Sequence, residues 1–404
     1  MENREYIKTG SQVYWRTLFI IFLGSMAAFG AEYCVQPIIP VIASSFGLNA
    51  VQGSLAVSLG LVGMSAAMLL IAGLAPRFDR KLATAVGLIG AAILLTIMIG
   101  FSGSFEAILG MRLIQGLLLA AFPSLIIAYI NEEFEPFNVG TVIGIYISGT
   151  TVGGLFGRLV VSAITDFVSW RMGLIVIGIL YLAVGIAFFM LLPKPKYQRQ
   201  RQSGGLQLIK TFHTALANKK LLWIYLVAFL IMGSFVAVFN FISYVLLAPP
   251  YSLSQTVVGL LFVVYLFGTF SSTYMGRLSD QHGNGRVLIL GLLIMLTGGL
   301  LTLLQPLVFK FIGLAIFTFG MLGSHSVACG WVGKLNQGDK AQSSSMYMFF
   351  YYAGASSLGT LGGVFLESYG WSGVIGMVAT AVIICLLVVV RLELSVSQHL
   401  LWHH

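Results

Sequence analysis

Long apolar runs separated by short polar stretches recur along the whole chain. Eight uncharged runs each come close to the roughly 20 residues that a membrane-spanning helix needs. These runs cover residues 82–105, 113–131, 136–157, 172–193, 287–309, 311–333, 341–366 and 368–390.

Two further apolar runs are about twice as long as one span. Residues 221–276 are interrupted by Pro249-Pro250, and residues 17–76 are interrupted by the short polar stretch 44–49. Proline and glycine at such points break a helix. Together with the eight single runs, this predicts an all-α integral membrane protein of twelve transmembrane helices.

Composition strengthens this prediction. Hydrophobic residues make up 58% of the 404 residues and charged residues only 9%, whereas soluble domains carry about 25% charged residues. An ordinary soluble enzyme is therefore excluded. The three cysteines all fall in predicted spans and are too few and scattered for a disulfide framework.

The basic residues predict the orientation of the chain. If the N-terminus is cytoplasmic, all but four of the 22 Lys and Arg residues fall on the cytoplasmic side, as the positive-inside rule requires. The exceptions are Arg112, Arg158, Arg171 and Lys310. We therefore expect both termini in the cytoplasm, and we interpret the net charge of +9 as a mark of orientation rather than of nucleic-acid binding.

A polar, basic stretch at residues 193–220 divides the chain into residues 1–192 and 221–404, with six predicted spans in each. The halves share weak internal repeats: Tyr146-x-x-Gly149 matches Tyr351-x-x-Gly354 in the corresponding span. Such symmetry is typical of transporters built from two repeats, with the binding site between them near the bilayer midplane. We expect two pseudo-symmetric six-helix bundles joined by a cytoplasmic linker.

Glu32 is the one carboxylate inside a long apolar run. A charge at this depth is costly and is by default a functional hypothesis, most simply a proton or cation site. At 1.5 Å per residue, Glu32 lies roughly 12 Å and Arg112 roughly 10 Å below the same outer surface. A direct or water-bridged pair between them is therefore possible.

Three interpretations of Glu32 remain open. Burial favours the protonated form of a carboxyl and a nearby guanidinium favours the ionised form, so Glu32 can load and release one proton per cycle. The alternatives are a static ion pair with Arg112 and direct recognition of a cationic substrate.

Three motifs occur at matching places along the twelve predicted spans. They are Gly276-Arg-Leu-Ser-Asp280-Gln-His-Gly283, Arg112-Leu-Ile-Gln115-Gly116 and Gly149-Thr-Thr-Val-Gly153-Gly154. With them the chain resembles the major facilitator superfamily over essentially its whole length, and in particular its drug and metabolite exporters. The resemblance implies a monomeric, cell-membrane transporter that works by alternating access, with the proton gradient as its energy source and no cofactor.

The resemblance also implies a set of residues for conformational switching: Gly149, Gly153, Gly154, Gly276, Arg277, Asp280 and Gly283. Two positions depart from the family pattern. Pro76 stands where the first-half loop motif has the aspartate that latches the outward-facing state, and Thr150 replaces the proline of the exporter motif.

In this superfamily the first, seventh and eleventh spans line the central cavity, so the resemblance makes their polar and amphipathic side chains lining candidates. These are Tyr33, Gln36, Asn240, Tyr244, Tyr347, Tyr351 and Tyr352, to which we add Tyr146 in the fifth span. Packing in the core is the alternative for each tyrosine.

Arg158 and His325 complete the candidate binding residues. Arg158 is a contact for an anionic substrate group, or it reaches the interface or pairs with Asp166. His325 is a titrating group, or a structural imidazole hydrogen-bonded beside Ser324 and Ser326.

We therefore expect a secondary transporter that exports a small organic or amphipathic compound in exchange for protons, with membrane lipids as its surroundings. The alternatives are uptake of a sugar or organic anion through Arg112 and Arg158, a lipid flippase, and a non-transporting receptor. An enzyme is disfavoured because the embedded charges form no catalytic set. The sequence has no phosphate-binding loop and no cluster with metal-ligand spacing.

Overall fold

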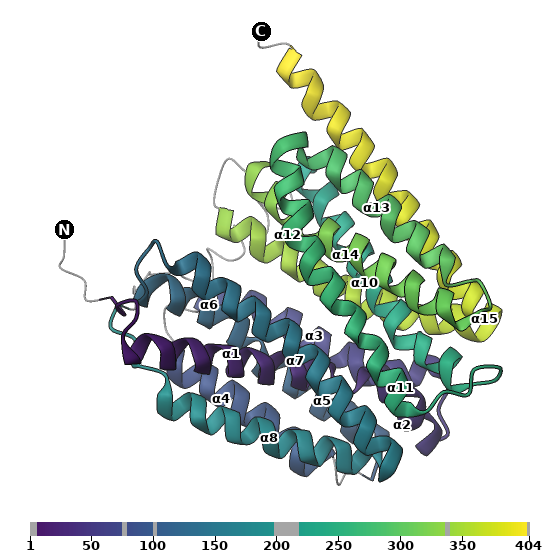
Figure 1. Cartoon of the computed structure of the whole chain (residues 1–404), viewed down its shortest axis with the longest axis horizontal. Coiled ribbons are helices and arrows are strands. Elements are labelled where there is room, and N and C mark those ends of the chain that lie inside the picture. Colours follow the sequence, from purple (N-terminus) through teal and green to yellow (C-terminus); the bar gives the residue numbers. More distant parts are fainter. Residues whose placement is uncertain (1–5, 75–78, 100–102, 198–217, 336–339, 402–404) are drawn as a thin grey trace. The chain divides into compact units, whose positions relative to one another are not determined.

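The computed structural model of the chain describes residues 6–74, 79–99, 103–197, 218–335 and 340–401 (Figure 1). The chain divides into two compact units, one formed by Met1–Ile42 and Leu59–Leu208 and the other by Ala43–Ser58 and Ile209–His404. Residues 43–58, which sequence analysis placed in the first bundle, thus group with the second unit.

Helices account for nearly all of the described part of the first half. They are α1 (Gln12–Tyr33), η1 (Gln36–Ile38), α2 (Ile39–Ser45), α3 (Ala50–Leu74), α4 (Arg80–Ile93), η3 (Leu94–Ile99), α5 (Phe105–Leu119), α6 (Ala121–Glu133), α7 (Val139–Phe167) and α8 (Trp170–Leu191).

The second half is also helical in its described residues. Its helices are α10 (Lys219–Leu247), α11 (Gln255–Leu260), η4 (Leu261–Val264), α12 (Tyr265–His282), α13 (Asn284–Leu301), α14 (Leu307–Leu335) and α15 (Lys340–Leu401).

The number of spans agrees with the prediction of twelve. Within the part of the chain that the structure describes, eleven helical segments are long and apolar enough to cross a membrane, and one of them, Ser343–Leu394, is 52 residues long. Gly370 interrupts this segment with a positive φ of 63°, so it consists of two helices joined at a kink. The prediction of an all-α membrane fold is confirmed.

Charged residues proved to be poor markers of where a span begins. The fourth, fifth and tenth spans extend past the predicted runs, to Phe105–Glu133, Val139–Phe167 and Leu307–Leu335. Arg112, Arg158 and Lys310 thus lie within helices, and all three are buried. Because other helices bury these basic side chains, they can lie inside a span. A search for uncharged runs ends each span at such a residue and so makes it too short.

The first span is not one continuous helix. The α-helix α1 ends at Tyr33, and the N–H of the next residue, Cys34, donates to the carbonyl oxygen of Gly30. A 3₁₀ turn, η1, then connects α1 to α2. Pro37 lies within this turn and has no N–H to donate. Backbone carbonyls at the end of α1 therefore need other donors.

Glycines let the first and fifth helices of each half approach closely. In the first unit, a Cβ added at Gly149 would lie 2.6 Å from the carbonyl oxygen of Phe22 in α1. In the second unit, a Cβ at Gly354 would meet the carbonyl oxygen of Phe229 in α10. The repeated Tyr-x-x-Gly pattern thus corresponds to the same helix contact in both halves, as small residues at helix interfaces do in membranes.

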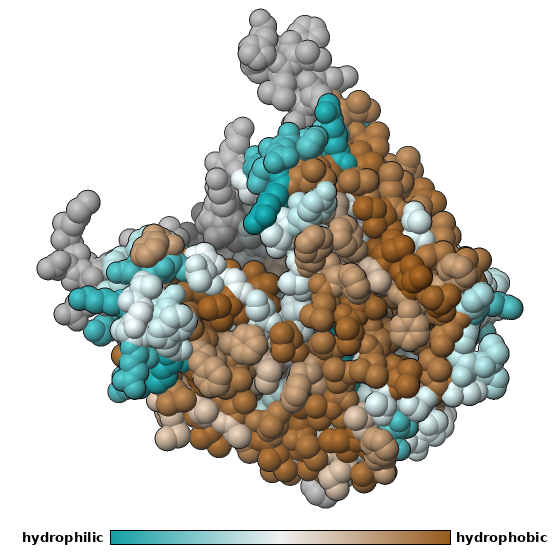
Figure 2. All heavy atoms as spheres, viewed as in Figure 1, coloured by the Kyte–Doolittle hydropathy of each residue, from teal (hydrophilic) through white to brown (hydrophobic). Residues whose placement is uncertain are grey.

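Apolar side chains cover the outer faces of the helices. Figure 2 shows mostly hydrophobic residues on the visible face, with hydrophilic residues gathered near helix ends. On α12, for example, Phe267 and Phe270 are 55% and 64% exposed. Exposed apolar surface of this extent suits contact with lipid rather than water.

Candidate functional site

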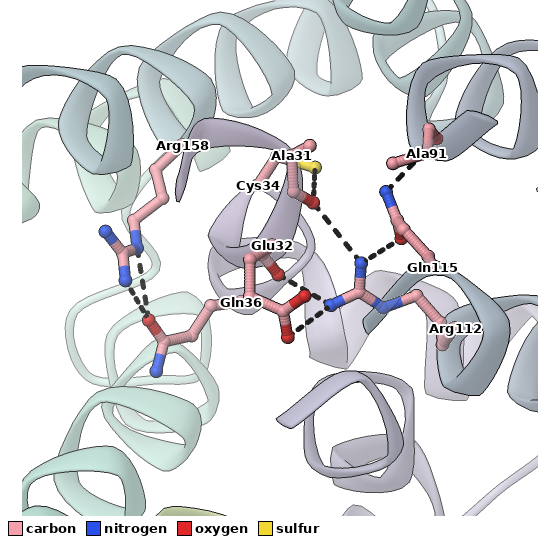
Figure 3. A network of polar contacts seen from close by, with 8 residues as sticks. All are labelled: Ala31, Glu32, Cys34, Gln36, Ala91, Arg112, Gln115 and Arg158. Atoms are coloured by element: carbon pink, nitrogen blue, oxygen red, sulfur yellow. Dashed lines mark hydrogen bonds and ion pairs between the residues drawn. The ribbon is translucent and has the colours of Figure 1, made fainter. Parts of the chain in front are cut away.

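Glu32 and Arg112 form a direct pair inside the first unit (Figure 3). Both are fully buried, Glu32 near the end of α1 and Arg112 in the middle of α5. The distance between Arg112 Nη2 and Glu32 Oε1 is 3.4 Å. The equal depths predicted for the two residues correspond to an actual contact.

Arg112 binds the backbone of α1 more closely than it binds the Glu32 carboxylate. Its Nη2 donates to the Glu32 carbonyl oxygen at 2.6 Å, and its Nη1 donates to the Ala31 carbonyl oxygen at 3.3 Å. These carbonyls belong to the end of α1, where the helix breaks. The guanidinium thus supplies donors, and a positive charge, at the negative end of the helix dipole.

Gln115, one turn along α5, holds Arg112 in place. Its Oε1 accepts a hydrogen bond from Arg112 Nη1, while its Nε2 donates to the carbonyl oxygen of Ala91 in α4 at 3.4 Å. Sequence analysis named Gln115 only as part of a motif. Its three-residue spacing from Arg112, which places both on one helix face, was the available signal.

Glu32 Oε2 is buried and has no hydrogen-bond partner among the described residues. A Cβ added at Gly60 in α3 would lie 2.5 Å from Glu32 Oε1 and 2.8 Å from Arg112 Nη2. Gly60 therefore makes room for the pair. Sequence reasoning missed this residue because an isolated glycine within a span carries no chemical signal.

Arg158 forms a second buried polar cluster, with a residue of the turn that follows α1. Its Nε and Nη2 donate to Gln36 Oε1 at 3.1 Å and 2.7 Å, and its Nη1 donates to the Gly154 carbonyl oxygen at 2.8 Å. The guanidinium carbon lies 4.7 Å from the centre of the Tyr33 ring. In Figure 3, Glu32 is directed toward Arg112 and Gln36 toward Arg158.

Two buried hydroxyl groups on α7 and α8 also lack hydrogen-bond partners among the described residues. They belong to Ser162, one turn beyond Arg158 on α7, and to Tyr181 on α8. A Cβ added at Gly157 would lie 3.0 Å from the Tyr181 hydroxyl. Neither residue was singled out from the sequence, where single hydroxyls in apolar spans are common.

Tyr146 lies apart from these clusters, against the aromatic core of the first unit. Its ring stacks on Phe122 at a centroid distance of 6.3 Å. Its assignment as a substrate contact stays a prediction.

The second unit holds an aromatic cluster around His325. The imidazole Nδ1 lies 2.9 Å from the Tyr347 hydroxyl, and the ring packs on Tyr351 at a centroid distance of 4.4 Å. The neighbouring Ser326 instead donates to the Ser272 carbonyl oxygen at 3.0 Å. Ser324 Oγ has no hydrogen-bond partner among the described residues. The described partner of the imidazole is thus a tyrosine rather than one of the flanking serines.

Asn240 and Tyr244 lie on α10. Asn240 is fully buried, and its Nδ2 donates to the carbonyl oxygen of Gly359 in α15 at 3.3 Å. Tyr244 packs on a core cluster that contains Phe241 and Val374. Their proposed contact with substrate remains a prediction.

The second-half loop motif lies at the end of α12. Gly283 ends the helix with a φ of 91° and donates its N–H to the Ser279 carbonyl oxygen. Asp280 pairs with Lys334 at 3.5 Å, and Lys334 also donates to Asn284 Oδ1 at 3.0 Å. The motif therefore joins the ends of α12 and α14 to the start of α13.

The corresponding first-half motif is only partly described. Pro76 lies outside the described residues, whereas Asp79 caps α4 by accepting a hydrogen bond from the Leu82 N–H at 2.8 Å. Arg80 at the start of α4 pairs with Glu132 at the end of α6, at 2.6 Å. In the first unit the end of the fourth span, α6, thus carries the anion Glu132. In the second unit the end of the corresponding span, α14, carries the cation Lys334.

Comparison with known sequences places this arrangement in a family. The model of the Major Facilitator Superfamily matches residues 21–251 and 233–400. The inner membrane transport protein YnfM of Escherichia coli (strain K12) is 37% identical over 394 residues, covering 97% of this chain and 94% of that protein. The chloramphenicol resistance protein CraA of Acinetobacter baumannii is 24% identical over 285 residues, covering 70% of this chain and 68% of that protein.

Solved structures agree on the fold. A bacterial homolog of the human lysosomal transporter Spinster, in an inward-facing and occupied conformation, superposes with a TM-score of 0.77 at 16% identity and covers 96% of this chain and 98% of that one. Since the family match covers nearly the whole chain, the chain belongs to the Major Facilitator Superfamily and is a multi-pass membrane transporter rather than an enzyme.

Proposed function

We propose that this transporter couples the movement of a small organic compound to the proton gradient, and that Glu32 carries the proton. The fully buried carboxylate and its contact with Arg112 support the proposal. A carboxyl that is buried beside a guanidinium has both protonation states within reach, since the two influences oppose each other.

The observation that carries the proposal is that Arg112 has hydrogen-bond acceptors besides the Glu32 carboxylate. Its guanidinium already donates to the carbonyl oxygens of Ala31 and Glu32 and to the side chain of Gln115. When Glu32 is protonated, Arg112 therefore keeps these hydrogen bonds. Oε2, which has no described partner, is the atom we expect to take the proton.

Protonation of Glu32 changes the interactions of the first span at the point where its helix is interrupted. Loss of the negative charge removes the Coulomb attraction between α1 and Arg112 on α5 and leaves the two backbone contacts. We propose that this change, at the point where α1 gives way to η1, biases alternating access between the two six-helix halves.

The proton-carrier role is tested by difference infrared spectroscopy of the purified protein across a pH series. A protonated-carboxyl band should disappear in Glu32→Gln and persist in Glu106→Gln, which changes an exposed carboxylate on α5. In proteoliposomes, Glu32→Gln should abolish pH-gradient-driven transport while retaining substrate exchange. Gradient-driven transport that survives Glu32→Gln would exclude the proposal.

For direction, we propose export by proton antiport. Support comes from the Gly149-Thr-Thr-Val-Gly153-Gly154 segment and from the similarity to a chloramphenicol resistance protein. Cells that produce the protein should accumulate less labelled chloramphenicol than cells that produce Glu32→Gln, and a protonophore should remove the difference. Equal accumulation would count against chloramphenicol export.

Proton-coupled uptake of an organic anion is the second candidate. The observation that favours it is the buried Arg158, whose described hydrogen bonds go to the neutral groups of Gln36 and Gly154. An anion would be attracted by the positive field of the guanidinium. Uptake and export predict opposite signs of substrate flux in inverted and right-side-out vesicles.

We also propose that both termini are cytoplasmic, that the protein acts as a monomer, and that it needs no cofactor beyond the proton gradient. The distribution of Lys and Arg supports the orientation. A green fluorescent protein fused to the C-terminus should fluoresce, and an alkaline phosphatase fused there should be inactive. The reverse result would overturn the orientation.

A further inference from the structure

We infer that Arg158, together with Gln36 and Tyr33, is a carboxylate-binding site for the transported compound. Its role in transport rests on the second proposed function, proton-coupled uptake of an organic anion, whereas the binding itself depends only on the site. Neither the family match nor the relatives assign a ligand to these residues.

The geometry of the guanidinium is the first argument. Gln36 Oε1 accepts from Nε at 3.1 Å and from Nη2 at 2.7 Å, so it occupies the edge of Arg158 that binds a carboxylate through two parallel hydrogen bonds. The amide oxygen is a neutral, planar acceptor in the place of an anionic one. A carboxylate that displaced it would gain charge-assisted bonds, which are roughly twice as strong.

The position of Arg158 is the second argument. The side chain is 2% exposed, and its Nη1 bonds the Gly154 carbonyl oxygen one turn back along α7, so the group is not directed along the helix toward Asp166. A Cβ added at Gly154 would lie 3.0 Å from Nη1, so the glycine provides room for the guanidinium. An arginine inside a bilayer costs at least about 2.5–3.5 kcal/mol. A binding function accounts for keeping it there.

The balance of buried charge is the third argument. Among the described residues, the buried charges of the first unit away from the cytoplasmic helix ends are Glu32, Arg112 and Arg158. With Glu32 ionised, these three side chains sum to one positive charge, and a positive site attracts an anion.

Two further hydroxyls lie on the helices of the first unit: that of Tyr181, which a Cβ added at Gly157, next to Arg158, would meet at 3.0 Å, and that of Ser162, one turn from Arg158 along α7. The hydroxyls of Ser162 and Tyr181 are buried and have no described partner. Buried polar groups are normally satisfied, and a ligand with a second polar atom could satisfy them. The Tyr33 ring, 4.7 Å from the guanidinium carbon, adds an apolar face. These features suit an amphipathic carboxylic acid.

Charge also links this site to Glu32. A proton on Glu32 makes the surroundings more positive and so strengthens the binding of an anion, and by linkage the anion strengthens the binding of the proton. Cooperative binding of this sign is what symport needs. If benzoate and the proton on Glu32 strengthen each other's binding, the direction of transport is uptake rather than the export proposed above.

The test uses benzoate as a carboxylate probe and benzamide as its neutral analogue, each titrated against the purified full-length protein in lipid nanodiscs. Ligand binding raises the melting temperature by mass action. We expect benzoate, and not benzamide, to raise it. Equal shifts with both probes, or none with benzoate, would overturn the inference.

Substitutions locate the binding. Arg158→Gln and Gln36→Glu should each weaken benzoate binding about tenfold or more, the second because its own carboxylate would occupy Arg158. Gln36→Glu gives the cation a partner, so it should fold even if Arg158→Gln does not. Arg171→Gln, the same change at an arginine that stacks on Trp170, should bind as wild type. Unchanged benzoate binding in Gln36→Glu would exclude Arg158 as the site.

Glu32→Gln separates this inference from the proposed function. It imitates the protonated carboxyl, so benzoate should bind it more tightly than wild type, and the pH dependence of binding should disappear. Benzoate binding that depends on Arg158 but not on Glu32 would leave the carboxylate site standing and count against proton coupling. Proton-driven transport without carboxylate-specific binding would overturn the carboxylate site and leave the proposed function standing.

Discussion

Each of the four basic residues that the predicted orientation leaves outside the cytoplasmic side has a specific contact in the structure. Arg112 contacts Glu32 and the end of α1, and Arg158 contacts Gln36. Lys310 Nζ donates to the Thr302 carbonyl oxygen at 2.5 Å, and the Arg171 guanidinium lies 4.3 Å from the centre of the Trp170 ring. A basic residue within or beside a span is thus retained where nearby acceptors or rings compensate for lost hydration.

At this scale, Glu32 and Arg112 should differ sharply in their effect on stability. Arg112→Gln removes two bonds to the end of α1 and leaves a buried carboxylate unpaired, which costs about 3–5 kcal/mol when a buried pair is broken. Glu32→Gln keeps the backbone bonds and should cost about 1 kcal/mol or less. Tryptophan-fluorescence melting of both variants measures the difference. Equal losses would show that the ion pair, rather than the capping of α1, stabilises this region.

Glycine contacts dominate at the scale of elements. The first helix of each half packs on the fifth through glycines: Gly153 against the backbone of Met26 and Gly354 against that of Phe229. Without a hydrophobic driving force between helices in lipid, close backbone approach is a main source of association. The Gly-rich segment of the fifth span is therefore first of all a packing surface, whatever further part it has in switching.

Alanine substitutions test this packing with a control on the same helix. Gly153→Ala and Gly354→Ala each place a methyl group against backbone atoms and should destabilise by about 1–3 kcal/mol. Gly144→Ala, where nothing lies within 4 Å of the added Cβ, should be neutral or slightly stabilising, since alanine favours helix. Comparable melting temperatures for all three variants would contradict the packing role.

At the scale of the molecule, the two units share one plan with unequal details. Each joins the start of its third span to the end of its fourth, but by Arg80–Glu132 at 2.6 Å in the first unit and by Lys334 with Asn284 and Asp280 in the second. The first pair is 6% and 15% exposed and the second ion pair 56% and 75%. Pro76, where the family motif has its aspartate, lies outside the described residues, and the structure shows the ion pair Arg80–Glu132 at the start of α4.

Exposure predicts which pair matters for stability. Glu132→Gln should lower the free energy of unfolding by about 1.5–3 kcal/mol, and Asp280→Asn by only about 0.2–1 kcal/mol. The reversed pair Arg80→Glu with Glu132→Arg should recover part of the loss. If Asp280→Asn changes transport rates while stability stays constant, its role lies in switching. A larger stability loss for Asp280→Asn than for Glu132→Gln would refute this ranking.

The sequence by itself determined twelve helices, their breaks near residues 44–49 and at Pro249-Pro250, and the repeat of two halves, because a bilayer fixes helix length and excludes uncompensated polarity. It also identified Glu32 and Arg112, because a charge in an apolar run stands out. The uncharged runs stopped at Arg112 and Arg158, inside the spans Phe105–Glu133 and Val139–Phe167, because burial against other helices allows charges inside a span.

Only the tertiary structure decided what those charges touch. The broken end of α1, the capping of its carbonyls by Arg112, the space left by Gly60 and the pairing of Gln36 with Arg158 depend on residues far apart in sequence. The sequence shows that a charged side chain lies in an apolar span, where its burial costs free energy. The hydrogen-bond acceptors that offset this cost come from other segments, and only folding brings them together.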